Sequence, residues 1–132
     1  MPRRGQVALS TVILIGGIAI IIGVGLVYLV SSFLNSSFGY QSAERALAAA
    51  SSGTNDAMLR LVRNKDFQSS GYSIAVGSYS ATVAVSQDNP VPGEATIVSQ
   101  SVVSNYKRKV KTVVSVDQVT GEISILSSLI TL

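Results

Sequence analysis

The side chains that most often carry out chemistry in proteins are scarce in this chain of 132 residues, which contains no His and no Cys. Their absence excludes a His-based triad, a thiol nucleophile, a zinc finger, an iron–sulfur cluster and a disulfide framework. Without His, a Ser/Lys dyad is the only activated serine left to consider. Six of the seven carboxylates show neither the spacing of a calcium loop nor the pairing of a glycosidase: Asp56, Asp66, Asp88, Glu94, Asp117 and Glu122. We therefore expect no enzymatic activity, no cofactor and no metal site.

One group of charges is concentrated in the sequence, because Lys107, Arg108, Lys109 and Lys111 place four bases within five residues. Such a cluster could bind DNA, an anionic surface or an acidic face of another subunit. Alternatively, it is the solvated face of an edge strand, where lysines hinder aggregation, and we favour this interpretation. With 10 bases and 7 acids the formal charge is +3, which is weakly basic. If Arg3 and Arg4 belong to a removable leader, 8 bases and 7 acids leave +1, so we expect no general affinity for nucleic acid.

The elements that carry these residues divide at a change in composition, since no charged residue occurs between Arg4 and Glu44. Within this interval, residues 7–34 are almost all Val, Ile, Leu, Gly and Ala. A helix of about 20 apolar residues crosses the hydrocarbon core of a bilayer, so this segment is predicted to span a membrane. Because Arg3 and Arg4 precede it, the positive-inside rule places the N-terminus in the cytoplasm and the C-terminus outside.

Three small residues, Gly16, Ala19 and Gly23, fall on one face of the predicted membrane helix at spacings of three and four. Small side chains on one face permit two membrane helices to pack closely. The alternative is that the glycines are only compositional, because glycine is more frequent in membrane helices than in soluble ones. The spacing agrees with both interpretations.

Downstream, residues 43–62 repeat small and apolar side chains at steps of three and four, which predicts an amphipathic helix ending at residues 64–66. Gly53 in this helix costs about 1 kcal/mol relative to Ala and allows a slight bend. Five strands are predicted next, at residues 72–76, 79–85, 95–103, 107–116 and 122–126. In the fourth strand, one face carries Val110, Thr112, Val114 and Val116. Because no other helix is available, we expect an α+β fold in which an antiparallel meander packs on this helix.

In this order of parts, the sequence resembles the type IV pilin-like superfamily, in particular its minor-pilin (PilX-like) and pseudopilin branches as found in candidate-phylum bacteria. The similarity is carried by Arg3–Arg4–Gly5 followed by Gln6–Val7–Ala8–Leu9–Ser10, by the Ala-rich helix at 43–53 and 57–64, and by strand segments 95–99 and 106–110. The resemblance divides the chain into a prepilin leader at 1–5, an assembly half of the helix at 6–38, an amphipathic half at 39–66 and a sheet head at 67–132.

The resemblance implies that prepilin peptidase cleaves after Gly5 and that the new terminus, Gln6, is methylated. It further implies that the subunit leaves the membrane for a type IV pilus or fimbrium on the cell surface. Its partners would be other pilin subunits and, indirectly, the assembly platform and its ATPase. Family members usually carry Glu at the position of Ser10, and Gln6 replaces the commoner Phe or Met. These two departures favour a minor or initiating subunit, or a divergent subfamily. The alternative is an uncleaved single-pass membrane protein whose small β-domain binds or senses something outside the cell.

Overall fold

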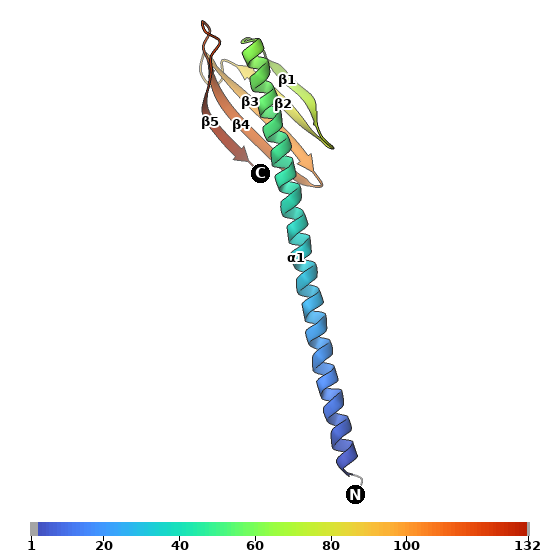
Figure 1. The fold of residues 1–132 in the computed structure, drawn as a ribbon. Helices are drawn as coiled ribbons and strands as arrows, with labels where there is room; N and C mark the ends of the chain where they lie inside the picture. The colour runs from blue at the N-terminus through green and yellow to red at the C-terminus, as the bar shows by residue number, and fades with distance from the viewer. Residues whose placement is uncertain (1–2, 132) are drawn as a thin grey trace. The chain divides into compact units, whose positions relative to one another are not determined.

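A computed structural model describes residues 3–131, apart from the side chains of Arg3, Arg4 and Gln6 (Figure 1). Helix α1 spans Arg3–Arg63 and five strands follow it: β1 (Ser69–Val76), β2 (Tyr79–Gln87), β3 (Glu94–Val103), β4 (Tyr106–Val116) and β5 (Ile123–Thr131). The chain divides into two compact units, Met1–Phe38 and Gly39–Leu132, and α1 contributes to both. Each unit is described by itself.

The first unit consists of the N-terminal part of α1, and the predicted helix over residues 7–34 is confirmed. It is long and apolar enough to cross a membrane. Every large apolar side chain in this segment is exposed, from 48% at Leu34 to 75% at Tyr28. A helix that is apolar on all sides is stable only where something other than water covers it, so this segment requires lipid or protein around it.

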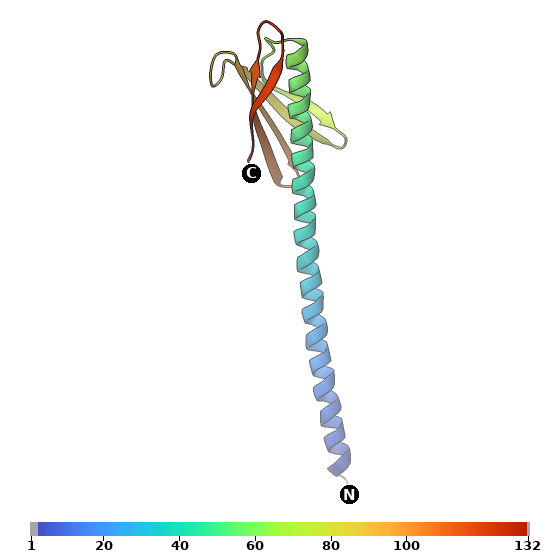
Figure 2. The same cartoon turned by 60° about the vertical axis from the view of Figure 1, so that its left-hand side comes forward.

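The second unit is an α+β domain in which residues 39–63 of α1 pack on one face of the sheet, as predicted (Figure 2). The strand order is β1-β2-β3-β4-β5, and every neighbouring pair is antiparallel. A two-residue turn joins β1 to β2, with Gly77 at a φ of 60°. The meander predicted from the sequence is therefore confirmed.

The strands differ from the prediction in where some of them begin and end, and β4 is not the edge strand that its lysines suggested. β1 begins at Ser69, three residues early, with an irregular register between Ser69 and Tyr72. β5 continues to Thr131, five residues beyond the predicted end. A register shift opposite Val113 and Val114 leaves Leu126 without a paired residue, and because this breaks the alternation of side chains, the sequence pattern does not show the second half of the strand. β4 lies between β3 and β5. The interpretation of its lysines as protection of an edge strand is therefore wrong.

The core of the second unit is built largely from small side chains. Of the apolar face predicted for this helix, Ala43, Ala46, Ala50, Ala57 and Leu61 are buried and Leu47 and Met58 are half-buried. Val62, predicted on the same face, is 62% exposed, and Ala49 is buried in addition. The predicted inner face of β4 is buried as well, at Val110, Thr112, Val114 and Val116. The main hydrophobic cluster forms around Leu61 and Ile97. The larger side chains thus gather near the C-terminal end of α1, and alanines line the rest of the interface.

Gly53 marks a very close approach of α1 to the sheet. A Cβ at this position would collide with Ser99 Oγ and would lie 2.8 Å from Val83 Cγ2 and 3.2 Å from Ala81 Cβ. Protein interiors are packed too densely to accept such contacts without displacement. Close packing, rather than a bend in the helix, accounts for this glycine.

Candidate functional site

The first candidate surface is the small-residue face of α1 at Gly16, Ala19 and Gly23. At 100° per residue these positions lie within about 60° of one another around the helix. A Cβ added at Gly16 or Gly23 would meet no atom within 4 Å among the described residues. The chain itself therefore gives no steric reason for glycine at either position, and the face is open to a neighbouring helix.

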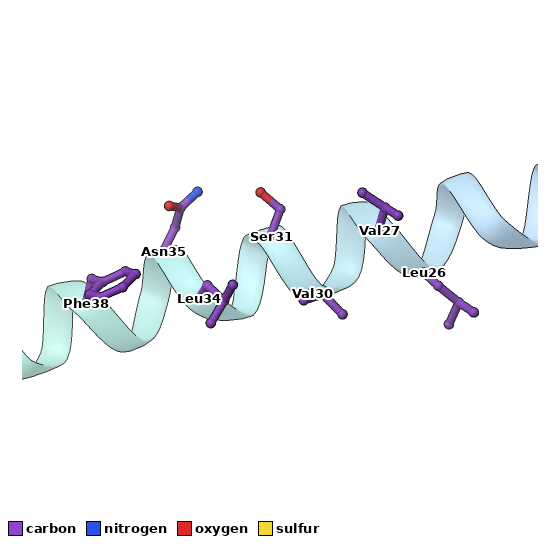
Figure 3. A pocket seen from close by; sticks show the side chains of 7 residues that line it. All are labelled: Leu26, Val27, Val30, Ser31, Leu34, Asn35 and Phe38. Carbon is purple, nitrogen blue, oxygen red and sulfur yellow. The ribbon is translucent and has the colours of Figure 1, made fainter.

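Further along the first unit, seven side chains surround a shallow depression of about 470 Å³: Leu26, Val27, Val30, Ser31, Leu34, Asn35 and Phe38 (Figure 3). All seven belong to one helix, so the depression has no opposite wall. A small-molecule site buries most of its ligand inside a concave cavity. This feature is therefore a surface for contact with lipid or protein.

The start of α1 carries the predicted cleavage and modification positions. Gly5 is exposed, and a Cβ there would meet nothing within 4 Å. The side chains of Arg3, Arg4 and Gln6 lie outside the described residues. Ser10 is exposed on the helix and bears an uncharged hydroxyl. One residue later, Thr11 Oγ1 donates to the carbonyl of Val7 at 2.9 Å, which satisfies a hydroxyl within the helix, as a lipid environment requires.

The basic cluster is divided between the two faces of the sheet. Because side chains alternate along a strand, Lys107, Lys109 and Lys111 lie on the face away from α1, whereas Arg108 shares the face of the buried Val110. Among the described residues, none of these four bases lies within 4.0 Å of a carboxylate. Their positive charge is therefore not neutralised within the part of the chain that the structure describes.

A polar link joins α1 to β1. Asp56 Oδ2 accepts from Arg60 Nε and from the Tyr72 hydroxyl, both at 2.8 Å. The Arg60 guanidinium lies 4.4 Å from the centroid of the Tyr72 ring, a cation–π distance. Burial opposes ionisation of Asp56, but the hydrogen bonds from Arg60 and Tyr72 outweigh it and lower the pKa of this carboxyl. Burial and the hydrogen bond to Asp56 raise the pKa of Tyr72 to about 12. At neutral pH Asp56 therefore remains ionised and Tyr72 remains protonated, so both hydrogen bonds that join α1 to β1 persist.

Nothing among the described residues assembles a catalytic or metal-binding constellation. No three Asp or Glu side chains gather there to hold a metal ion. Ser104 and Lys107 have the Ser-x-x-Lys spacing of some serine hydrolases. That spacing aligns two side chains on a helix, whereas here it spans the β3–β4 turn, with Ser104 at a φ of 51°.

Sequence reasoning located the candidate surfaces along the chain but missed two features of the second unit. The Asp56–Arg60–Tyr72 link was visible only as an acid and a base four residues apart on a helix, a common and weak signal. The role of Gly53 had no local signal, because its neighbours come from β2 and β3. Comparison with protein-family models, with curated proteins and with solved structures finds no match to this chain.

Proposed function

We propose that this chain is a structural, non-enzymatic subunit of a type IV pilus-like surface filament. The observation that carries the proposal is the uncovered apolar surface of residues 7–34. Lipid covers this surface while the chain spans the membrane with its N-terminus in the cytoplasm. Helices of other copies, or of related pilin subunits, cover it once the subunit has joined the filament.

The composition of this helix suits both environments. A charged residue at the centre of a membrane helix costs about 2.5–3.5 kcal/mol, and none occurs between Arg4 and Glu44. Lipid tails are as apolar as leucine, so moving the helix from lipid into a bundle of like helices changes the hydrophobic free energy little. Association then depends on close packing, for which Gly16 and Gly23 leave room.

The basic leader opposes this transfer, because Arg3 and Arg4 hold the helix end at the cytoplasmic headgroups. Cleavage after Gly5 removes both arginines and leaves Gln6, whose side chain is uncharged, as the first residue. Prepilin peptidase is the enzyme that the leader pattern favours, with methylation of Gln6 as a second modification. The leader is therefore the feature that separates a filament subunit from a permanent membrane anchor.

The mass of the protein recovered from membranes and from sheared surface material tests the proposal. We expect the loss of residues 1–5, with or without one added methyl group. Gly5→Leu should leave uncleaved protein in the membrane and none in filaments. A leucine at this position has free space within the described chain, so the variant tests processing rather than folding. Mature surface material that retains Arg3 and Arg4 would refute the proposal and favour the uncleaved anchor.

A further inference from the structure

The charges of the sheet are separated along the strand direction. The antiparallel meander places the turns at residues 88–93 and 117–122 at one end and the β3–β4 turn at the other. All four acids of residues 67–132 lie at or next to the first end: Asp88, Glu94, Asp117 and Glu122. All four bases lie in the half of β4 next to the other end, three of them close to the turn and Lys111 at the middle of the strand: Lys107, Arg108, Lys109 and Lys111. Between Lys107 and Ser115, the partner of Glu94 in β3, the β4 strand rises about 26 Å.

The basic end is the end at which α1 enters the second unit. A Cβ at Gly39 would collide with the hydroxyl of Tyr106, the first residue of β4, and would lie 3.1 Å from its Cζ. Both views show the β3–β4 turn beside α1 (Figures 1 and 2). Leu34, the last residue of the apolar segment, precedes Gly39 by only five positions. Even a fully extended chain spans no more than about 18 Å over this length, so the covalent connection limits how far Gly39 can move from a membrane that residues 7–34 span.

The residues around this turn combine positive charge with exposed apolar surface. Val102, paired with Lys107 across the sheet, is 55% exposed, and Tyr106 is 42% exposed. On the helix at the same end, Glu44 is followed directly by Arg45, so the bases of β4 keep their excess charge. Tyrosine prefers the headgroup region of a membrane, and lysine and arginine are attracted to anionic lipids.

We propose that this end of the domain, the docking strip Val102, Tyr106, Lys107, Arg108 and Lys109, binds the anionic headgroups of the membrane that the apolar helix spans. Lys111, one step farther along the outer face, adds to the attraction. Lipid is favoured over the acidic end of a second copy, because the covalent connection to the membrane segment keeps the headgroups at high effective concentration. The contact goes beyond the filament role, since it holds equally for an uncleaved anchor. It keeps the domain on the lipid surface until the subunit is extracted.

The full chain reconstituted in vesicles provides the test. The chain has no cysteine, so Ser104→Cys in the β3–β4 turn takes a single nitroxide label. Its collisions with a nickel-chelating lipid headgroup, measured by electron paramagnetic resonance, report contact with the membrane surface. The vesicles contain phosphatidylcholine alone or mixed with phosphatidylglycerol. Lys107→Gln combined with Lys109→Gln is compared with Arg63→Gln combined with Lys65→Gln, which removes the same charge at the other end of the domain.

Each base near an anionic surface changes the binding equilibrium about 5.4-fold, so removing two should lower the ratio of docked to undocked domain about 30-fold. We expect strong label contact only in the anionic vesicles, loss of contact at 1 M salt, where the Debye length is about 3 Å, and no change in the control variant. Equal contact in neutral vesicles, or contact that persists in the Lys107/Lys109 variant, would overturn the proposal. A label whose collisions with nickel instead become fewer as protein density rises, at fixed lipid charge, would assign the strip to a second copy. None of these outcomes depends on leader cleavage, so the filament proposal is tested separately.

Discussion

Replacing Gly53 by alanine tests whether α1 approaches the sheet as closely as the structure describes. On an isolated helix this change is favourable, because alanine is about 0.8–1.0 kcal/mol better than glycine in a helix interior. In the folded domain the new methyl group would collide with Ser99 Oγ and would sit 2.8 Å from Val83 Cγ2. Overpacking of this kind costs about 1–3 kcal/mol. The two effects oppose each other, and the sign of the result shows which one is larger.

We expect a net loss of about 1–2 kcal/mol, since two contacts below 3 Å place the overpacking cost in the upper part of its range. Ser99 is fully buried, and its Oγ has no hydrogen-bond partner among the described residues. Ser99→Ala should therefore be neutral or stabilising by itself, because it removes a buried unsatisfied hydroxyl. It also removes one of the two collisions, so Gly53→Ala should be less destabilising in the Ser99→Ala background by about 1 kcal/mol.

Urea unfolding of the full chain in detergent micelles, followed by tyrosine fluorescence, measures the four members of this double-mutant cycle. A gain in stability for Gly53→Ala alone would show that the helix does not lie this close to β2 and β3. The same loss with Ser99 and with alanine at position 99 would show that Ser99 is not the group that the methyl displaces.

Three further results are expected. Gly23→Leu should abolish incorporation into filaments while membrane insertion persists, and Gly25→Leu, about 160° away around the helix, should be incorporated normally in the same shearing assay. Because the pKa of Asp56 is lower in the folded state, its ionised carboxylate stabilises the fold above the ordinary pKa of 3.8, and this contribution is lost as the pH falls through the pKa of the folded state. Asp56→Asn should remove this acid dependence of the free energy of unfolding in urea titrations. Tyr72 keeps its proton in the folded state up to a pKa of about 12, so stability should fall by about 1–2 kcal/mol between pH 10 and 12, after allowance for solvent screening, and Tyr72→Phe should flatten that slope.

The fold was predictable because each element has a strong local signal. An uncharged apolar stretch, a period of three to four with alanine on one face, and alternating strands separated by turn residues each limit the chain to one kind of structure. With a single helix available to cover the sheet, the α+β architecture followed. The inner face of β4 was read correctly from alternation alone, and Val114 is fully buried as expected.

Features that depend on distant parts of the chain were not predictable. The length of β5 is one such feature, because the register shift beside Val113 hides the alternation of its residues. The predicted meander itself already placed β4 between β3 and β5, so the edge-strand interpretation conflicted with the predicted topology. The nearness of Tyr106 to Gly39 joins positions 67 residues apart, which no local pattern reports.

The glycines of α1 fall into two groups: Gly53 is required by packing within the domain, whereas any requirement for Gly16 and Gly23 must come from a neighbouring molecule. Gly53 has a steric reason within the domain, because any side chain there would meet β2 or β3. Gly16 and Gly23 have no such reason, because the space around them is empty within the described chain, and each weakens a helix relative to alanine in water. If Gly23 is needed for filament assembly and Gly25 is not, the requirement comes from one particular face, which general helix flexibility or composition does not explain. The neighbour that imposes it must then approach closely enough that a leucine side chain would exclude it, and lipid, which is fluid, imposes no such limit. A difference between these two variants would therefore identify a packed protein partner for the apolar helix.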